Sequence, residues 1–460
     1  METKNFIKNK ILKPTPAKTI ILGFMGIILI GTLLLCLPIS HTNGKWYSFV
    51  DSLFTSTSAV CVTGLTVIDV AKELTLFGQI IILLLIQLGG LGFVSLACLI
   101  FMLLGKKINY STRMSLQESL NTETTQGLVK RVRKIIIVVF SVEFVGFLCL
   151  APSLINFTGN FWSGCFKALF LSISALCNAG FDPLGNATVE FSNLAYFANN
   201  PFVLIPIMLL IVTGGIGFVV LFDIFNFKRE TKKLQFHTKV VLIVTTILIF
   251  GGALLFAIFE WNNPNTIGNM SVFNKILNCL FQSITPRTAG FATFDQGALT
   301  SISVFITNFL MIVGGSPMGI AGGIKTTTLF VLIVILFKQS MNDGSYNFRK
   351  TKIKNKTINK SIRLLLTVAL LIFVGTLLIS LFEYGNFITV EQIVFECVSA
   401  ISTVGLTLGV TPFLTIGSKI VLMLLMFVGR IGMLTIPLAF TTTNHIENEI
   451  EFADSKIIVG

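Results

Sequence analysis

Four short glycine-ended stretches, rich in hydroxyl side chains, are the residues best suited to chemistry in this sequence. They read FTSTSAVCVTG over 54–64, FLSISALCNAG over 170–180, FQSITPRTAG over 281–290 and FECVSAISTVG over 395–405. Their closing glycines are 116, 110 and 115 residues apart. A spacing this long indicates repetition of a whole supersecondary unit.

Such stretches could replace the water around a monovalent cation with backbone carbonyl oxygens. A ring of carbonyls does this without net charge, and its geometry and field strength discriminate between ions. Glycine permits the left-handed or extended backbone that turns successive carbonyls the same way. Pro286 is compatible with this, because the chemistry uses acceptors and can spare one N–H. The predicted cation-binding residues are Val62, Thr63, Gly64, Asn178, Ala179, Gly180, Thr288, Ala289, Gly290, Thr403, Val404 and Gly405.

Few residues suit any other chemistry. The eight cysteines lie in or beside apolar segments and form no CxxC pair, so we expect neither a disulfide framework nor a metal site. The three histidines, at 41, 237 and 445, are far apart in the sequence. No phosphate-binding loop or phosphorylatable aspartate motif is present to supply energy. We therefore expect a protein that is not an enzyme, and transport that is passive or ion-coupled.

The composition is that of an integral membrane protein. Hydrophobic residues make up 53% of the chain and charged residues 12%, with a mean hydropathy of +0.85. Ordinary globular chains carry about 25% charged residues. Apolar runs such as 20–37, 74–104 and 420–438 are long enough for the roughly 20 residues of a spanning helix.

The net charge of +13 is unevenly placed. Lys and Arg concentrate in the N-terminal segment and in alternate connections, and the intervening connections hold only Lys45. Short loops rich in Lys and Arg stay in the cytoplasm, so both termini are predicted to be cytoplasmic. The tryptophans at 46, 162 and 261 fall on the opposite side, as interfacial anchors do. The basic excess therefore indicates topology, and we expect no nucleic-acid partner.

Each glycine-ended stretch lies between two apolar runs. Each unit is therefore predicted as a spanning helix, an outer re-entrant segment and a second spanning helix, because non-helical backbone at membrane depth must be buried or line water. The expected fold is an all-α integral membrane protein with four pseudo-symmetric repeats (eight spanning helices) around a central cation pore. The predicted divisions are a basic cytoplasmic N-terminal segment (1–17), repeats at 18–104, 133–226, 237–338 and 362–440, cytoplasmic linkers at 105–132 and 339–361, and a cytoplasmic C-terminal tail (441–460).

The second apolar run of the third repeat is interrupted by GGSPMGIAGGIKTTT over 314–328. Five glycines and a proline do not support a regular helix, so residues 313–325 are predicted to form an intramembrane loop, which would act as a gate or as a second ion contact. A simple kink is the alternative, and it leaves the buried lysine and the threonines unexplained. The predicted gate residues are Gly314, Gly315, Ser316, Gly322, Gly323, Lys325 and Arg430.

The second runs of the other repeats carry related segments: QLGGLG at 87–92, TGGIG at 213–217 and VGRIG at 428–432. Small residues at this spacing favour close helix packing. Ionisable residues inside a membrane are costly and usually functional, which singles out Glu143 along with Lys325 and Arg430. For Glu143 the sequence leaves two roles open, a structural partner to another group or a part in transport.

The four glycine-ended filters, the GGSPMGIAGGIKTTT loop and the VGRIGMLT segment together resemble the Trk/Ktr/HKT superfamily of potassium transporters, most closely its KtrB members. The resemblance covers nearly the whole chain. It implies four helix–pore–helix repeats, K⁺ bound at the filter residues, selectivity for K⁺ with glycine at 64, 180, 290 and 405, and an arginine, here Arg430, that contacts the gating loop. Many relatives carry Gly-Ser-Thr where this chain has Met318-Gly319-Ile320, so two hydroxyls are missing from its loop.

The resemblance also implies partners and a location. We expect a homodimer in a bacterial plasma membrane (the cell inner membrane), docked on a cytoplasmic ring of nucleotide-binding RCK subunits that are KtrA-like or KtrC-like. Nucleotides would bind that ring and not this chain, and Na⁺ would act as an activating or coupling ion. The predicted function is sodium-stimulated potassium uptake. A less selective or sodium-conducting transporter is the alternative, and a non-conducting membrane receptor or assembly subunit is a third, of a different class.

Overall fold

The computed structural model describes residues 16–92, 128–185, 193–226, 233–338, 345–348 and 351–432. Most of the predicted N-terminal segment, most of the linker 105–132 and the whole C-terminal tail lie outside these residues. The described part is mainly helical, as predicted, and its one two-stranded sheet is a small hairpin.

Four helices are long and apolar enough to cross a membrane by themselves: α2 (Pro16–Cys36), α7 (Leu128–Thr158), α11 (Phe236–Glu260) and α15 (Asn355–Phe382). Each is the first helix of one predicted repeat. Large apolar side chains stay exposed along their outer faces, for example Leu33 (62%), Ile247 (64%) and Leu366 (63%). Exposed apolar surface of this kind suits a lipid environment.

Each long helix is followed by a shorter helix that packs against it: α3 (Phe49–Cys61), α8 (Phe161–Leu176), α12 (Val272–Ile284) and α16 (Val390–Ser402). These re-entrant helices begin at polar caps and end at the glycine-ended strands. The aromatic residue that opens each stretch is fully buried, with no exposed surface on Phe54, Phe170, Phe281 or Phe395. The repeated phenylalanine is therefore a packing anchor for the re-entrant helix.

The second helix of each unit is shorter than the sequence suggested. The helix α4 (Leu76–Leu91) ends before Gly92 (φ +79°), and α17 (Ile416–Ile431) ends before Gly432 (φ +107°). The apolar runs 74–104 and 420–438 extend beyond these ends into residues outside the described part of the chain. Glycine in a left-handed conformation stops the helix at a fixed place.

In the second unit the predicted second spanning helix of the repeat 133–226 is not one continuous helix. It is divided into α9 (Pro201–Ile216) and α10 (Phe218–Asn226), which are bent by 98° at Gly217 (φ +94°). In the third unit the predicted break is confirmed, because α13 (Ser301–Ile312) and α14 (Thr326–Phe337) are separated by an irregular loop.

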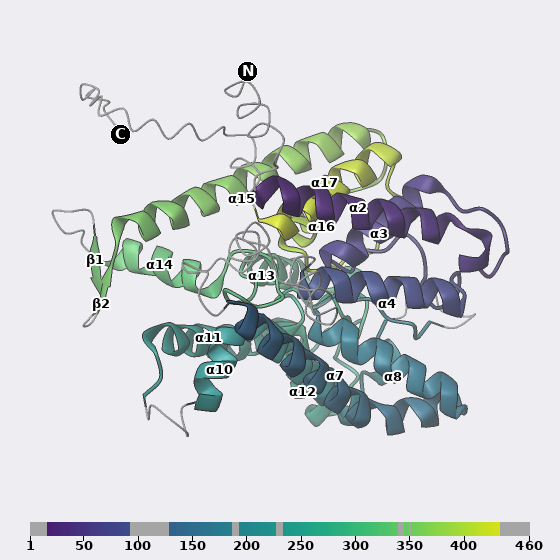
Figure 1. Cartoon of the computed structure of the whole chain (residues 1–460), viewed down its shortest axis with the longest axis horizontal. Coiled ribbons are helices and arrows are strands. Elements are labelled where there is room, and N and C mark those ends of the chain that lie inside the picture. Colours follow the sequence, from purple (N-terminus) through teal and green to yellow (C-terminus); the bar gives the residue numbers. More distant parts are fainter. Residues whose placement is uncertain are drawn as a thin grey trace, which may run out of the picture.

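The hairpin consists of β1 (Tyr346–Phe348) and β2 (Thr351–Ile353), paired antiparallel with Tyr346 opposite Ile353. It lies beside the ends of α14 and α15, at one end of the molecule (Figure 1). Within the described residues, four short 3-10 helices occur in the connections: η1 (Pro38–Ser40), η2 (Ala195–Phe197), η4 (Gln296–Ala298) and η5 (Thr411–Phe413).

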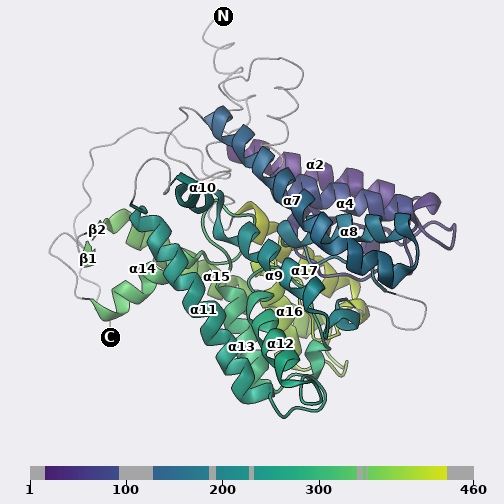
Figure 2. The ribbon, with the colours of Figure 1, turned by 90° about the horizontal axis from the view of Figure 1, so that it is seen from below.

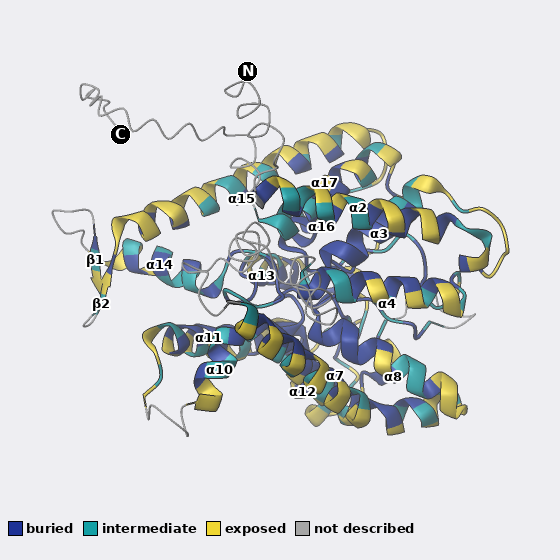
Figure 3. Ribbon diagram, viewed as in Figure 1, coloured by how far each residue is buried: buried dark blue, intermediate teal, exposed yellow. Residues whose placement is uncertain are grey.

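The units surround a common centre. Seen from below, α11, α12 and α13 lie on one side of the molecule, and α2, α4, α7 and α8 lie toward another (Figure 2). The inner ends of the re-entrant helices are buried, whereas the outer faces of the long helices are exposed (Figure 3). A salt bridge of 2.8 Å between Lys419 of α17 and Asp51 of α3 links the last unit to the first.

Candidate functional site

All four re-entrant helices are followed, within six residues, by the same unusual pair of backbone conformations. The first residue of each predicted filter triplet is left-handed, with φ between +51° and +75°, and the closing glycine also has positive φ, between +71° and +96°. The four left-handed residues are Val62, Asn178, Thr288 and Thr403. Only glycine adopts φ near +90° at low cost, which explains why each stretch closes on one. The helix therefore turns abruptly into an irregular strand.

A hydroxyl from the re-entrant helix fixes each strand, in two different ways. In the first and fourth units Ser58 and Ser399 accept a hydrogen bond from the N–H of the closing glycine, at 3.1 and 3.0 Å. In the second unit Ser174 donates to the carbonyl of Phe181 at 2.7 Å, and in the third Thr285 donates to that of Phe291 at 2.5 Å. The four strands thus share one shape, but their hydrogen bonds follow one pattern in the first and fourth units and another in the second and third.

The four strands form a closed ring. A methyl group added to Gly64 would lie 2.5 Å from the carbonyl oxygen of Ala179, and one added to Gly180 would lie 2.9 Å from that of Ala289. Methyl groups on the other two closing glycines would collide with the next carbonyl in the same manner, Gly290 with Val404 and Gly405 with Thr63. Each unit therefore abuts the next in chain order, and the fourth abuts the first. The structure brings all twelve predicted filter residues together.

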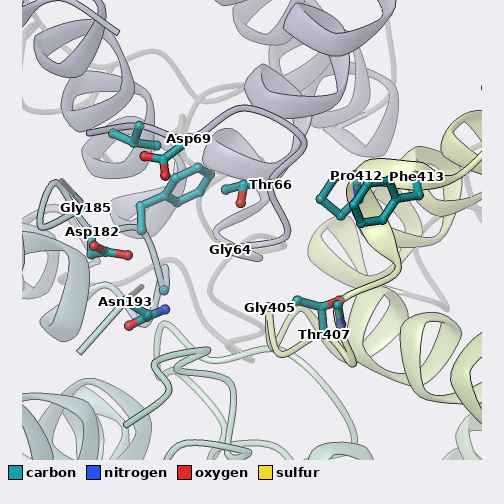
Figure 4. Close-up of a pocket in the computed structure, with 14 residues that line it drawn as sticks. Gly64, Thr66, Asp69, Asp182, Gly185, Asn193, Gly405, Thr407, Pro412 and Phe413 are labelled. Carbon is teal, nitrogen blue, oxygen red and sulfur yellow. The ribbon is translucent and has the colours of Figure 1, made fainter. Parts of the chain in front are cut away.

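A cavity of about 210 Å³ opens at one mouth of this ring. Three of the closing glycines line it, together with Asp69, Asp182 and Thr407. The two carboxylates lie on one side of the cavity, and Thr407 lies across from them (Figure 4). The sequence reasoning missed both acids. Each acid follows a closing glycine by two to five residues, on the side predicted to face outward. This spacing is the sequence signal that could have identified them.

Asp182, one of the two acids at this mouth, has a shifted pKa. Burial raises the pKa of its carboxyl to about 6, with a further upward contribution from the nearby Asp69. The N–H of Leu184, which donates to the carboxylate at 3.0 Å, opposes this shift. Asp69 itself accepts hydrogen bonds from the N–H groups of Ala71 and Lys72. Ionisation of Asp182 therefore adds negative charge to this mouth.

The loop 313–325 hydrogen-bonds to the bend between α9 and α10. The N–H groups of Ser316 and Ile320 donate to the carbonyls of Gly215 and Gly214, at 2.8 and 3.1 Å. A methyl group on Gly217 would lie 2.5 Å from the carbonyl oxygen of Pro317, so glycine is required for this close approach. The bend that the sequence did not predict is thus the place where the loop from the third unit is accommodated.

The loop also has internal contacts. Lys325 Nζ donates to the carbonyl of Ala321 at 2.6 Å, and the hydroxyls of Ser316 and Thr326 are 2.8 Å apart. Gly314 packs against Gly322 and Gly323, so that Cβ atoms there would collide with backbone. The residues predicted as the gate therefore form one compact structure. A simple kink does not account for these contacts.

The loop lies against the inner side of the ring. A Cβ on Gly322 would lie 2.8 Å from the carbonyl of Ser402 and would also collide with the Thr403 side chain. Arg430 donates to the carbonyl of Ile320 in the loop (2.5 Å) and to that of Gly89 at the end of α4 (2.5 Å). It thereby bridges the third unit to the first from its position on the fourth. We refer to these hydrogen bonds as the Arg430 bridge.

The glycine-rich segments of the second helices serve close packing, as predicted. A Cβ on Gly89, Gly214 or Gly429 would collide with a carbonyl near the end of the neighbouring re-entrant helix. The carbonyls belong to Val60, Leu176 and Ile401, each four residues before a closing glycine. Small residues let these helices support the ring directly.

Comparison with known proteins agrees with this arrangement. The family model described as TrkH, cation transport protein, matches residues 14–448. The Ktr system potassium uptake protein B of Bacillus subtilis is 39% identical over 98% of this chain and 99% of that protein. The potassium/sodium uptake protein NtpJ of Enterococcus hirae is 35% identical, over 97% of each chain. The crystal structure of the potassium transporter TrkH from Vibrio parahaemolyticus has a similar fold, with a TM-score of 0.65 at 18% identity, over 92% of this chain and 85% of that one.

Proposed function

Because this chain belongs to the TrkH family of cation transport proteins, with relatives of the KtrB type, we propose that it carries potassium into the cell through the ring of four glycine-ended strands. The observation that carries the proposal is the closed ring. Each closing glycine packs against the carbonyl of the residue that precedes the closing glycine of the next unit. The names of the relatives, which are potassium and potassium/sodium uptake proteins, support the choice of ion.

In this proposal the strands replace the hydration shell of K⁺. The left-handed residue followed by a positive-φ glycine orients successive carbonyls, and the hydroxyls of the re-entrant helices hold the strands in place. The re-entrant helices end at the ring, and a helix C-terminus carries a partial negative charge that favours a cation. The carboxylates of Asp69 and Asp182 raise the local cation concentration at the outer mouth. A negative potential inside the cell drives uptake, by about 2.3 kcal/mol per charge and 100 mV.

We place the gate at the loop 313–325. Its position against Thr403 and its backbone bonds to α9 support an obstruction on the inner side of the ring. The Arg430 bridge holds that obstruction, since hydrogen bonds from a charged group contribute about 1.5–3 kcal/mol each. Opening requires these bonds to break while the filter stays intact.

Regulation would come from the cytoplasm. The proposed partner is an RCK-type nucleotide-binding ring, on a homodimer of this chain, with Na⁺ as an activating or coupling ion. The basic segments 228–239 and 349–363 are candidate docking surfaces. The hairpin of β1 and β2, whose second strand lies in the second segment, contacts α14, because the rings of Phe348 in β1 and Phe330 are 4.9 Å apart in an edge-on arrangement. Since α14 follows the loop directly, a partner that moves the hairpin would act on the gate.

The second candidate is a transporter that conducts sodium as well, and the potassium/sodium name of the Enterococcus hirae relative favours it. Cation flux into liposomes holding the full chain, at a set negative internal potential, separates the two. Potassium and rubidium influx far above sodium and lithium, with selectivity reduced in Gly290→Ser, is the expected result. Equal sodium and potassium influx would support the second candidate, and no influx of any ion in a loop-deleted variant would refute both.

A further inference from the structure

Three of the four units seat their re-entrant helices with the same hydrogen bond, and this contact defines equivalent positions. A serine hydroxyl of the re-entrant helix donates a hydrogen bond to a backbone carbonyl of the preceding long helix. The serine also packs against a glycine of that long helix, three residues after the carbonyl. The pairs are Ser56 with Ile28 (2.8 Å), Ser172 with Glu143 (2.6 Å) and Ser283 with Ile249 (2.7 Å). In the fourth unit Cys397 faces Gly375, which makes Ile372 the equivalent residue. Glu143 therefore stands where the other three units have isoleucine.

The partner of Glu143 is Gln87, and the residues equivalent to Gln87 in the second and fourth units are apolar. Gly89, Gly214 and Gly429 each pack against a carbonyl near the end of a re-entrant helix, so these glycines occupy equivalent positions. The residues two positions before them are therefore equivalent as well. These residues are Gln87, Val212 and Phe427. Gln87 Nε2 donates to both carboxylate oxygens of Glu143, at 3.0 and 3.2 Å. The first and second units thus share a polar contact where their counterparts are apolar.

The contact extends to the second filter strand. The Cys177 thiol donates weakly to Gln87 Oε1, with 3.8 Å between sulfur and oxygen. Cys177 directly precedes Asn178, the first residue of the second filter triplet. Its sulfur also packs against α4, because a Cβ on Gly90 would lie 2.6 Å from it. Glu143, Gln87 and Cys177 form one chain of hydrogen bonds, which we call the Glu143 chain.

The same turn of α4 carries the acceptors of the Arg430 bridge. The carbonyls of Gly89 and Gly90, two and three residues after Gln87, both accept from Arg430 Nη2. The helix ends two residues later, at Gly92. A glycine-rich helix end has little packing of its own to hold its carbonyls in place, and Gln87 is the residue of that turn whose side chain hydrogen-bonds to another helix.

Glu143 is costly to keep at this position. Its side chain is 3% exposed in the middle of a long apolar helix, and a carboxylate there must be stripped of water. The other three units seat the same helices with isoleucine, so the fold does not require a carboxylate. A buried polar pair of this kind adds little to stability compared with apolar residues of similar volume, which leaves a role other than stability open to it.

We propose that Glu143 is a positioning residue for the gate: through Gln87 it holds the last turn of α4 where its carbonyls receive Arg430, and so stabilises the closed loop. This inference rests on the proposed function of the loop 313–325 as a gate. Loss of the Glu143 chain would leave the Arg430 acceptors misplaced and the loop more easily displaced. The filter strands keep their own hydroxyl contacts, so ion selectivity is expected to change little.

The test converts this contact to the apolar form found in the other units. The double variant Glu143→Ile with Gln87→Val removes both polar partners, and such exchanges are often neutral or stabilising. Rubidium influx is measured into liposomes holding the full chain alone. We expect influx about tenfold above wild type, as for weakening one charge-assisted hydrogen bond, with the rubidium-to-sodium ratio retained. The matched control Ile249→Leu, at the equivalent position of the third unit, is expected to leave influx unchanged.

Two further variants separate positioning from a structural role. Glu143→Gln keeps an oxygen that accepts from Gln87, so its influx is expected to stay within about twofold of wild type, whereas Glu143→Ile alone raises it. In an Arg430→Ala background the double variant should add nothing, because both changes act through the same contact.

Wild-type influx in a folded double variant, or an equal rise in Glu143→Gln, would overturn the inference. A full additional rise in the Arg430→Ala background would overturn it as well. A failure of the proposed function looks different: neither the wild type nor a variant lacking residues 316–322 would then carry rubidium.

Discussion

A methyl group at the closing glycine of the second unit should disturb the filter far less than one in the fourth unit. In Gly180→Ala the new Cβ meets the Ala289 carbonyl at 2.9 Å, and φ is +71°, near the left-handed region that other residues can occupy. In Gly405→Ala the Cβ collides with the Thr63 carbonyl, and φ is +93°. Gly64 lies between these cases, with a contact of 2.5 Å and φ of +96°.

The expected magnitudes follow from two terms. A side chain in a sparsely populated backbone region costs about 1–3 kcal/mol, and forced overlap in a packed site costs about another 1–3 kcal/mol. For Gly405→Ala both apply in full, giving about 2–6 kcal/mol against the native strand conformation. A hundredfold preference between two ions corresponds to only about 2.8 kcal/mol, so this variant should lose most of its selectivity. For Gly180→Ala about 1–2 kcal/mol is expected, with a severalfold loss.

The assay is the rubidium-to-sodium influx ratio in liposomes, for alanine at each of the four closing glycines. Gly251→Ala is the matched control, because this glycine lies within α11 and a Cβ there meets nothing within 4 Å. The reasoning predicts the smallest loss of selectivity at Gly180 and the largest at Gly405. Equal losses at all four positions, or a larger loss at Gly180 than at Gly405, would refute the strain argument.

Further predictions concern the gate, the mouth and the ring. Arg430→Ala should raise potassium influx about tenfold in the chain alone, because it removes the bridge to the loop, and an unchanged influx would leave Arg430 with packing only. Deleting Ser316–Gly322 should raise influx further, and unchanged or abolished influx in a folded variant would contradict gating by the loop. Asp182 is ionised above and neutral below its pKa of about 6, so influx at low potassium should fall about twofold to fourfold as external pH is lowered through 6. Asp182→Asn should abolish that pH dependence, and an unaltered pH profile would assign it to another group. Lys419→Met should lower the stability of the detergent-solubilised protein by at most about 1 kcal/mol by removing the bond to Asp51, and a loss that persists in high salt would contradict an electrostatic origin.

The sequence predicted those parts of the site that depend on local backbone chemistry. The shared conformation of the glycine-ended strands was predictable because it requires glycine at the end, and the hydroxyls that hold these strands recur at similar positions before each glycine. The break at 313–325 was found because glycine and proline exclude a regular helix. In both cases residue type limits conformation directly.

Long-range contacts were not predictable in this way. The 98° bend at Gly217 depends on Pro317, a hundred residues later, and TGGIG alone equally suits a straight, closely packed helix. Gln87 and Glu143 meet across two units, and neither residue indicates the other in sequence. Asp69 and Asp182 converge only when the ring closes. Glu143 stands out in the sequence as an ionisable residue inside an apolar run, but its partner does not.

The central claim is that the carbonyls of the four strands bind a dehydrated monovalent cation on a common axis. Anomalous diffraction from crystals of the full chain grown in rubidium tests this most directly. The account predicts anomalous density at the centre of the ring, enclosed by the carbonyls of Thr63, Ala179, Ala289 and Val404, and its loss when sodium replaces rubidium. A ring without rubidium density, in crystals that show rubidium elsewhere in the protein, would contradict it.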